Sequence, residues 1–544
     1  MFADLIITNG RIYTMDASLP LAEAVAVAGD RILAVGTESE IATLRRPTTD
    51  QLDLRGRSLL PAFSDSHIHL LNTARARQRM DLSKARSRQD AAATVAQRAA
   101  ETPAGHWLIG NGWNRNIWHD TALPTKRDLD RAAPDTPVVL NSKDLHSMWV
   151  NSRALAQAGI NASTPDPPGG LIVREAGSGE PSGILLERAC TMVSRVYPPP
   201  SVADCVDAIK SAIPMAWQAG ITGIHQMGDK PDCLAFRAFQ QMHQEGELDL
   251  RVLYYFPRES LETVTRLGLR SGFGDQRLRI GGIKLFADGS LGSHSAWMLE
   301  PFEDEPDNRG VPWHEPEELQ ALVRKASDGG LAVAVHALGD RANRETIKAI
   351  AMARQAAQES SLSKSGPTQV RLRHRIEHAQ LLHPDDIPLL AEWQIIASMQ
   401  PVHCPSDVSM AVRHWGEPRC AGAYAWRSVL DCGARLAFGS DAPVESLDVL
   451  TGIQAAVTRR PAGGSHDPDV WHPEQRVSAV QAVHAYTMGA AYAAGEEHWR
   501  GSVSPGKLAD MIVLSNDIFR CPAMDIAAAR VDLTLFGGRI VHQA

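Results

Sequence analysis

Eight short apolar runs that alternate with helix-compatible stretches constrain the fold of this 544-residue chain more than any other feature. The runs occupy residues 58–67, 220–227, 250–256, 278–286, 331–340, 372–379, 394–403 and 435–443. Helices cover the strands of a parallel sheet, so such strands appear in a sequence as nearly continuous apolar runs. Eight of them, each followed by a helical stretch, predict an α/β fold of the (β/α)₈ TIM-like barrel type.

The connection after the first run is too long for one helix and its loops, because about 150 residues separate His69 from Gly220. This stretch has strand signals at 107–112 and 137–142, a helix signal at 89–101 and a Pro/Gly-rich turn at 166–170. We therefore expect an inserted α/β subdomain at 72–212. Because it follows the first barrel strand, we expect it to cap the barrel mouth, where the strands end.

The two ends of the chain share another pattern. Residues 1–57 and 500–544 carry short β-branched strands separated by turn glycines, which is typical of a small antiparallel sandwich. Since they flank the other segments, we expect them to pair with each other. This leaves residues 58–71 and 213–499 for the barrel.

Composition excludes several classes of partner. The net charge is −8 and no Lys/Arg block stands out, which argues against a nucleic-acid or anionic-membrane partner.

The N-terminal residues lack the features of a signal peptide, and no apolar run is long enough to span a bilayer. Seven scattered cysteines without a CxxC pair indicate reduced thiols. We expect a cytoplasmic protein.

Polar residues at the ends of the predicted barrel strands form the strongest functional signal. They are His67 and His69 in FSDSHIHL, Lys284, His336, His378 and Asp441. Residues two apart on a strand point to the same face, and the carboxyl ends of barrel strands meet at one mouth. Alone, each histidine could be a core residue, the aspartate a helix N-cap and the lysine a surface residue. Together, imidazoles and a carboxylate predict a site for a zinc-like ion.

Several stretches of the chain resemble the metal-dependent amidohydrolase superfamily, and specifically its YtcJ-like branch, which includes N-substituted formamide deformylases. They are PAFSDSHIHL, DLHSMWVNSRAL, GGIKLFADGSLGS, VAVHALGDRAN, RIEHAQ, FGSDAPV and SPGKLADMIVL, and they extend from residue 61 to 514. The resemblance implies a barrel with a β-sandwich, an α/β insertion and a centre with one or two metal ions. One departure is His294, where the resemblance leads us to expect arginine.

The resemblance also implies roles for the six strand-end residues. His67, His69 and Asp441 would bind a first metal, His336 and His378 a second, and Lys284 would bridge them as a carboxylated lysine. The ions implied are most simply two Zn²⁺, with Mn²⁺ or Fe²⁺ as alternatives. The superfamily also makes a homodimer the default assembly.

The function expected from these residues is hydrolysis of the C–N bond of a small N-substituted amide or formamide. Metal-bound hydroxide would attack the carbonyl, while Asp441 accepts the water proton and delivers it to the leaving amine. A mononuclear deaminase or a cyclic amidohydrolase remains the alternative. Gly339, followed by Asp340, stands where a deaminase typically has glutamate. A non-catalytic scaffold fits less well, because all six ligands are retained.

Further candidates surround this centre. His146 in the insertion is a candidate donor to the substrate oxygen, unless Asp144 holds it as a structural histidine, and His225 ends the second strand. Trp113 and Trp118 are candidate pocket residues for an apolar or aromatic substituent, although tryptophans are as common in cores. Two carboxylates that follow ligand-bearing strands either orient the ligand imidazoles or cap loops. These carboxylates are Asp288 and Asp340. Asp288 and His294 are also candidates for substrate binding.

Overall fold

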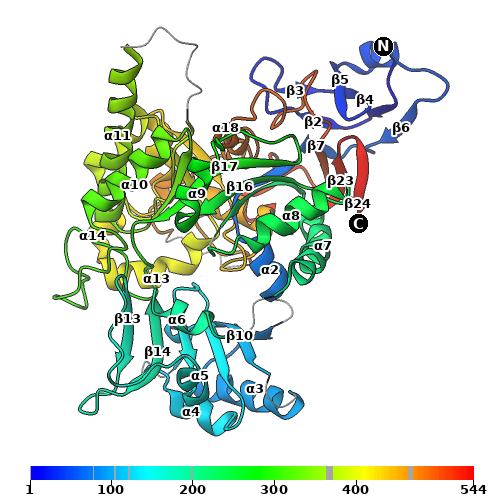
Figure 1. Ribbon diagram of the computed structural model, residues 1–544. Helices are drawn as coiled ribbons and strands as arrows, with labels where there is room; N and C mark the ends of the chain where they lie inside the picture. The colour runs from blue at the N-terminus through cyan, green and yellow to red at the C-terminus, as the bar shows by residue number, and fades with distance from the viewer. Residues whose placement is uncertain are drawn as a thin grey trace.

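An eight-stranded parallel sheet curls into a barrel at the centre of the molecule (Figure 1). The computed structural model describes residues 2–76, 79–102, 106–119, 123–197, 200–228, 230–362, 372–463 and 470–544. The barrel strands, in sheet order, are β8 (Phe63–Ile68), β15 (Ile221–Met227), β16 (Arg251–Pro257), β17 (Leu278–Phe286), β18 (Ala332–Ala337), β19 (Arg375–His378), β20 (Ile396–Met399) and β21 (Arg435–Phe438). The (β/α)₈ prediction is therefore confirmed.

The first and last barrel strands meet just beyond their ends. The Asp441 amide donates to the His67 carbonyl at 2.7 Å, and the His69 amide donates to the Ala442 carbonyl at 3.0 Å. These two hydrogen bonds bring the residues after β21 directly against the end of β8. The barrel is thus closed at the mouth, where the predicted metal ligands lie.

The first apolar run is divided between two sheets. Ser58–Pro61 forms a separate strand, β7, which pairs with strands near the two ends of the chain, whereas Phe63–Ile68 begins the barrel. Every residue of both strands is buried. Because no polar residue stands between Leu59 and Phe63, the sequence pattern alone does not reveal where the chain leaves one sheet for the next.

Amphipathic helices cover the barrel. In α10, for example, Leu319, Val323 and Ala326 are buried at helical spacing, and Pro316 stands in the first turn, where its missing N–H costs nothing. The helices after β15 to β21 are α8 (Leu234–Gln244), α9 (Leu261–Arg266), α10 (Pro316–Asp328), α11 (Asp340–Leu362), α12 (Ile387–Glu392), α13 (His403–Trp415), α14 (Glu417–Cys420), α15 (Trp426–Asp431), α16 (Val449–Thr458), α17 (Ala479–His484) and α18 (Ala490–Ala494).

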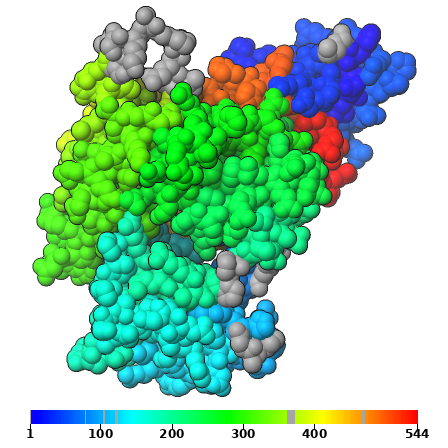
Figure 2. Space-filling view, in the orientation of Figure 1, coloured from blue at the N-terminus to red at the C-terminus, as the bar shows by residue number. Residues whose placement is uncertain are grey.

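The long connection after β8 carries its own six-stranded sheet, in the order β13-β14-β12-β11-β10-β9. Its strands are β9 (Met80–Asp81), β10 (Leu108–Trp113), β11 (Val138–Ser142), β12 (Ser147–Val150), β13 (Gly170–Arg174) and β14 (Pro181–Glu187). The helices of this connection are α2 (Leu70–Ala76), α3 (Arg88–Glu101), α4 (Lys126–Ala132), α5 (Ser152–Gln157), α6 (Cys190–Ser194) and α7 (Val202–Gln218). Figure 2 shows this part of the chain as a lobe at one end of the barrel. The lobe contains the six-stranded sheet with α3 to α6, and we refer to it as the insertion, whereas α2 and α7 pack on the barrel (Figure 1).

The two ends of the chain share a sheet on the other side of the barrel (Figure 1). In that sheet β7 pairs antiparallel with β22, so that Leu60 faces Ile512. Its strands are β24 (Arg539–Gln543), β23 (Val531–Phe536), β22 (Met511–Leu514), β7, β2 (Arg11–Tyr13) and β3 (Leu21–Ala22), and the neighbouring sheet contains β5 (Arg31–Gly36), β4 (Ala24–Ala28), β1 (Leu5–Thr8) and β6 (Asp50–Asp53), with the short helix α1 (Glu38–Ala42). Two pairs, β1–β6 and β2–β7, are parallel, so these sheets are mixed and not purely antiparallel.

Candidate metal centre

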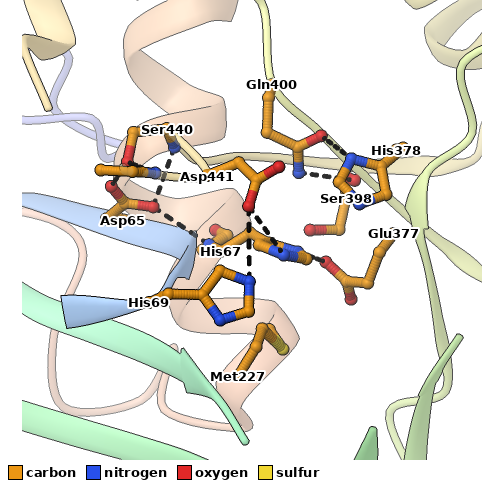
Figure 3. Close-up of polar contacts among 12 residues, drawn as sticks. Asp65, His67, His69, Met227, Glu377, His378, Ser398, Gln400, Ser440 and Asp441 are labelled. Carbon is orange, nitrogen blue, oxygen red and sulfur yellow. Dashed lines mark hydrogen bonds and ion pairs between the residues drawn. The ribbon is translucent and has the colours of Figure 1, made fainter. Parts of the chain in front are cut away.

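His67 and His69 reach the barrel mouth from β8. His67 Nε2 lies 3.4 Å from Asp441 Oδ1, and His69 Nε2 lies 3.5 Å from the same oxygen (Figure 3). The centroids of the two rings are 5.5 Å apart. The two-residue spacing in the sequence therefore places both imidazoles against one carboxylate that comes from the last strand of the barrel.

His336 and His378 come from the neighbouring strands β18 and β19. Their ring centroids are 4.5 Å apart, and the His378 ring lies 4.9 Å from that of His67. Within the described residues, His67, His378 and Asp441 form one of two groups whose ligand atoms all lie within 4.8 Å of one another. Four strands of the barrel thus direct imidazoles and a carboxylate to one point.

Burial and neighbouring charges together determine the protonation states of these side chains. Burial, together with the Lys284 ammonium, lowers the pKa of His67 to about 4. Burial also lowers the pKa values of His336 and His378 well below the usual range. Burial alone would raise the pKa of Asp441, but the surrounding histidines, His67 foremost, hold it well below its usual value. Neutral imidazoles and an ionised carboxylate are the forms that bind a divalent cation.

Three of the imidazoles use their second nitrogen to bind an acceptor outside the cluster. His67 Nδ1 donates to Glu377 Oε2 (2.6 Å), His378 Nδ1 to Gln400 Oε1 (2.8 Å) and His336 Nε2 to the Gly289 carbonyl (2.9 Å). Such hydrogen bonds set the tautomer and orientation of a metal-binding histidine. These hydrogen bonds leave a lone pair for a metal ion on Nε2 of His67, on Nε2 of His378 and on Nδ1 of His336.

Asp65 fastens the HxH motif to the strand that carries Asp441. Its carboxylate accepts hydrogen bonds from the backbone amides of His67 and Ser440, both at 3.0 Å, and from the Ser440 hydroxyl at 2.5 Å (Figure 3). Burial raises the pKa of Asp65 to about 7.

Asp441 and His378 have positive φ values of 58° and 72°, a conformation that residues with a Cβ adopt rarely and that clusters at functional sites.

Lys284 lies on β17 with only 1% of its surface exposed. Its Nζ atom is 4.7 Å from the centroid of the Phe286 ring, which is 5.1 Å from the ring of His336. The positive charge of Lys284 contributes to the lowered pKa values of His336 and His378. The lysine therefore belongs to the buried surroundings of the histidine cluster.

A cavity of about 400 Å³ adjoins the cluster and is lined by both the barrel and the insertion. His336, His378 and Asp441 contribute to its lining from the barrel. The apolar residues that line it from the insertion are Trp113, Ile117, Leu123, Val173, Ile184 and Leu186. Its volume is in the range of sites for small organic molecules.

His146 enters this cavity from the insertion. Its Nδ1 atom donates to Glu187 Oε2 at 2.9 Å, and its ring lies 5.2 Å from the ring of His336. Burial opposes the charged form, but Glu187 outweighs burial and raises the pKa of His146 to about 9. Asp144 accepts a hydrogen bond from the backbone amide of His146 and does not hold the ring. His146 thus offers a charged donor to a bound molecule.

His403 is a cavity residue that the sequence patterns do not single out. It begins α13, and its Nε2 atom lies 3.5 Å from Asp441 Oδ2. Burial opposes its charge, but Asp441 and nearby Asp407 raise its pKa. The signal that would have revealed it is its position, because it ends the apolar run 394–403, as the other candidates end theirs.

His225 does not reach the cavity, contrary to the expectation that it faces the mouth. It lies two residues before the end of β15 and is fully buried. Arg375 Nη1 donates to His225 Nδ1 at 2.7 Å, deeper in the barrel. The ring contacts this arginine and is not among the side chains that line the cavity, so the catalytic role of His225 stays a prediction.

Of the two tryptophans predicted to line the pocket, only Trp113 does so. Trp118 is 5% exposed and packs against Trp113 and Trp149, with ring centroids 5.9 Å and 6.2 Å away. Trp113 takes part in the same core, and its Nε1 atom donates to the Leu140 carbonyl at 2.9 Å. Core packing therefore accounts for Trp118.

Asp288 lies outside the cavity and anchors a loop. Its carboxylate accepts hydrogen bonds from the backbone amides of Trp297, Leu338 and Gly339 at 2.8–3.0 Å. Burial raises its pKa to about 7. Its oxygen is 3.8 Å from His336 Nε2, which instead donates to a backbone carbonyl. Asp288 thus holds the loops after β17 and β18 in place.

Asp340 and His294 also lie away from the cavity lining. Asp340 begins α11 and accepts hydrogen bonds from the backbone amides of Leu299 at 2.8 Å and Arg341 at 2.9 Å, so it joins the segment around Leu299 to the start of the helix. His294 Nδ1 donates to Glu305 Oε1 at 2.7 Å, and its ring stacks near His414 at 4.1 Å. Neither residue contacts the cluster around Asp441 in the part of the chain that the structure describes.

A buried ion pair between Arg375 and Glu377 lies next to His67. Arg375 and Glu377 are two residues apart on β19, so both point into the barrel, and Arg375 Nη2 donates to Glu377 Oε2 at 2.9 Å. Burial alone would raise the pKa of Glu377, but Arg375 and His67 lower it far below its usual range. Glu377 is therefore an anion that increases the basicity of His67.

Replacing Glu377 with glutamine is expected to weaken metal binding by about 10- to 100-fold. The amide oxygen can still accept the hydrogen bond from His67, but it lacks the charge that favours a cation beyond the ring. Competition with a chromophoric chelator measures the affinity, and a thermal melt shows whether Arg375 tolerates the loss of its partner. Glu345→Gln, at a pair with Lys348, is the matched control. An unchanged affinity would contradict the role given to Glu377.

Comparisons with known proteins identify relatives that match nearly the whole chain. Residues 50–542 match the Amidohydrolase family. The chain is 34% identical to the protein YtcJ of Bacillus subtilis (strain 168) over 542 residues, which cover 98% of each chain. It is 27% identical to the N-substituted formamide deformylase of Arthrobacter pascens over 571 residues, which cover 99% of this chain and 98% of the relative.

A solved structure has a similar fold over almost its whole length. A metal-dependent hydrolase of Pyrococcus horikoshii OT3 superposes with a TM-score of 0.76 at 26% sequence identity. The match covers 95% of this chain and 99% of the archaeal chain. The barrel, the insertion and the terminal sheets together are therefore the architecture that this protein shares with metal-dependent hydrolases.

Among the described residues, we find no helix that is both long enough and apolar enough to cross a bilayer.

Proposed function

The chain belongs to the amidohydrolase family, and from this premise we propose that it hydrolyses the C–N bond of a small N-substituted amide or formamide. The observation that carries the proposal is the cluster of buried, neutral imidazoles and one ionised carboxylate beside a cavity. A donor set of this kind suits a zinc-type ion, because nitrogen and carboxylate ligands in a deprotonated state are what that ion requires.

We assign the predicted ligands to two ions, for which Zn²⁺ is the first choice and Mn²⁺ or Fe²⁺ the alternatives. His67, His69 and Asp441 would hold one ion, and His336 and His378 the other. A divalent ion of this type makes water nucleophilic near neutral pH and polarises a carbonyl oxygen.

Lys284 is the residue that we assign to the bridge between the ions, as a carbamate. Its amine would form an N–C bond with carbon dioxide and release a proton, which turns a cation into an anion with two oxygens. The strands β15, β16 and β17 contain neither Asp nor Glu that could supply this anion. The burial of Lys284 beside three imidazoles supports the assignment.

The chain's own side chains provide the proton transfers. Asp441 is ionised and adjoins the cavity, so it can accept a proton from the attacking water and return it to the amine nitrogen as the bond breaks. His146 carries a proton at neutral pH and lies beside His336 in the cavity lining, where it can donate to the substrate oxygen. An amide nitrogen is a poor leaving group until it is protonated, so Asp441 must deliver the proton to it. The donor at His146 stabilises the negative charge that develops on the carbonyl oxygen.

The lining of the cavity supports an apolar substituent on the substrate. Besides the apolar residues of the insertion, Leu291, Leu338, Met410 and Val444 line it from the barrel. The relative from Arthrobacter pascens is described as an N-substituted formamide deformylase, and such a substrate combines a small acyl group with a larger amine substituent. We therefore propose N-substituted formamides as the first substrates to test.

A panel of N-formyl, N-acyl and cyclic amides, assayed for release of the amine, tests the proposal directly. The metal-free protein, prepared with a chelator, is expected to be inactive, and added Zn²⁺, Mn²⁺ or Fe²⁺ is expected to restore amine release. Aminated heterocycles are included, because release of ammonia from them without cleavage of any amide would identify a deaminase. Full activity of the metal-free protein would also overturn the proposal.

We further propose that the insertion acts as a cap that selects the substrate. Ile117 is 40% exposed and lines the cavity. Replacing it with alanine is expected to change the ratio of kcat/KM between large and small N-substituents by about 10-fold, while metal content stays the same. Leu171→Ala is the matched control, since Leu171 is 43% exposed on β13 and does not line the cavity. A loss of metal with unchanged selectivity would contradict the cap.

A further inference from the structure

We propose that His294, Asp304 and His414 form a separate site for a zinc-type divalent cation, outside the cavity. The site would join the loop after β17, which carries His294 and Asp304, to the last turn of α13, which carries His414. It shares no residue with the cluster around Asp441. It is therefore independent of the reaction proposed above.

The geometry of this trio already approaches that of a metal site. One ligand atom from each residue lies within 4.8 Å of the other two. The rings of His294 and His414 are 4.1 Å apart, and His414 Nδ1 and Asp304 Oδ2 are joined by a hydrogen bond of 2.8 Å, which an ion between them would replace. Ligand atoms around a tetrahedral zinc ion lie about 3.3 Å apart, given bonds of about 2.0–2.1 Å. Small side-chain movements would therefore close the trio around an ion.

A second observation points to a ligand at this place. The Nε2 atom of His294 is buried and has no hydrogen-bond partner among the residues that the structure describes, and the side chain is 10% exposed. Its Nδ1 atom is hydrogen-bonded to Glu305, which leaves Nε2 as the ring nitrogen available to a ligand. A buried nitrogen without a partner is costly. A carboxylate behind a histidine is also the usual support of a metal-binding imidazole.

The charges of the trio suit a cation. Burial lowers the pKa of His414, which favours the neutral ring. Burial would raise the pKa of Asp304, but its hydrogen bond from His414 lowers it, so this carboxylate is ionised at neutral pH.

A network of hydrogen bonds and ion pairs is the competing interpretation. In it Arg413 Nε, 3.4 Å from Asp304 Oδ2, takes the place of the metal charge. However, the Arg413 side chain is 65% exposed and can turn into solvent. The network also leaves His294 Nε2 unsatisfied, whereas an ion would satisfy it.

An ion at this place would brace two walls of the cavity. Leu291, Gly292 and Ser293 line the cavity directly before His294, and His403 and Met410 line it from α13. The loop and the helix are already joined by one backbone hydrogen bond, from the Glu303 amide to the His414 carbonyl at 2.8 Å. The ion would add side-chain bonds next to this contact and hold the loop against the helix.

Metal stoichiometry of the full-length protein tests the site. The protein is dialysed against Zn²⁺, and bound zinc per chain is measured for the wild type and for the His294→Ala and His414→Ala variants. Each variant is expected to bind one ion fewer than the wild type, and to lose part of the Zn²⁺-induced rise in melting temperature. His243→Ala, at an exposed His–Asp pair, is the control and is expected to bind as many ions as the wild type.

Asp304→Asn decides the question if the alanine variants do not fold, because it keeps the shape of the side chain. We expect it to weaken zinc binding at this site by at least 10-fold, seen as one weaker equivalent in a calorimetric titration. Equal stoichiometry and equal affinities in the wild type and in Asp304→Asn would overturn the site. The catalytic ligands are untouched in all these variants, so failure of the proposed function would leave this result unchanged.

Discussion

Replacing Asp441 with asparagine is expected to lower kcat/KM by at least about 10³-fold, more than any other change in the cavity. Among the residues that the structure describes, Asp441 alone combines contact with His67 and His69, an ionised carboxylate and a place in the cavity lining. Asparagine keeps the size of the side chain and one oxygen ligand, but it cannot accept a proton. The loss should therefore appear mainly in kcat, with a smaller decrease in metal affinity.

The measurement pairs steady-state kinetics with metal analysis on the same preparation. If kcat falls while the variant retains at least one metal ion per chain, the loss of activity is attributed to proton transfer. Asp431→Asn, at an exposed pair with Arg427, provides a matched control for an Asp→Asn change and should behave as the wild type. Hydrolysis within 10-fold of the wild-type rate would show that another group carries the proton, and His403, 3.5 Å away, would be the next candidate.

The barrel was predictable from the sequence because its strands are buried on both faces. Several strands, such as β16 with VLYYF and β18 with AVAV, contain continuous apolar runs, and a helical stretch follows each of them. The same property hid the division between β7 and β8, since Pro61 and Phe63 are both buried although they belong to different sheets. Apolar periodicity thus predicts which residues form strands, but it does not show which strands are neighbours.

The candidate ligands were predictable because they share a topological position, the carboxyl end of a barrel strand. The residues that orient them were not, because their role depends on contacts between strands distant in sequence. Glu377 acts through His67, 310 positions away in the chain, and Asp65 through Ser440, 375 positions away. The depth of His225 in the barrel was not predictable for a related reason: a short apolar run does not show how far inside the barrel each of its residues lies.

The insertion was predictable as a segment but not in its contacts. Its length and its strand signals follow from the sequence, whereas the lining of the cavity depends on how the lobe sits against the barrel. Two tryptophans in one turn-rich stretch, Trp113 and Trp118, have different surroundings for this reason. Glu187 raises the pKa of His146, but nothing in the sequence around Glu187 distinguishes it from a surface carboxylate.

Replacing Lys284 with alanine is expected to remove both metal binding and activity, the second large effect. Lys284 is almost fully buried, and its charge acts on three imidazoles of the cluster. An ammonium would repel two divalent cations, whereas a carbamate would neutralise part of their charge and give each an oxygen ligand. The variant should therefore bind less than one ion per chain under conditions that saturate the wild type, with kcat/KM at least about 10³-fold lower.

Chemical rescue separates the carbamate from a lysine that acts as an amine. In Lys284→Ala, short carboxylates such as acetate or propionate can occupy the space of the missing side chain and supply the two oxygens of the bridge. Rescue by these acids, but not by methylamine, is expected to restore metal content and activity together. Because the carbamate also needs carbon dioxide, metal reconstitution of the wild type should be faster in bicarbonate than in degassed buffer. Full metal content in Lys284→Ala, or rescue by amines alone, would show that Lys284 acts through its ammonium.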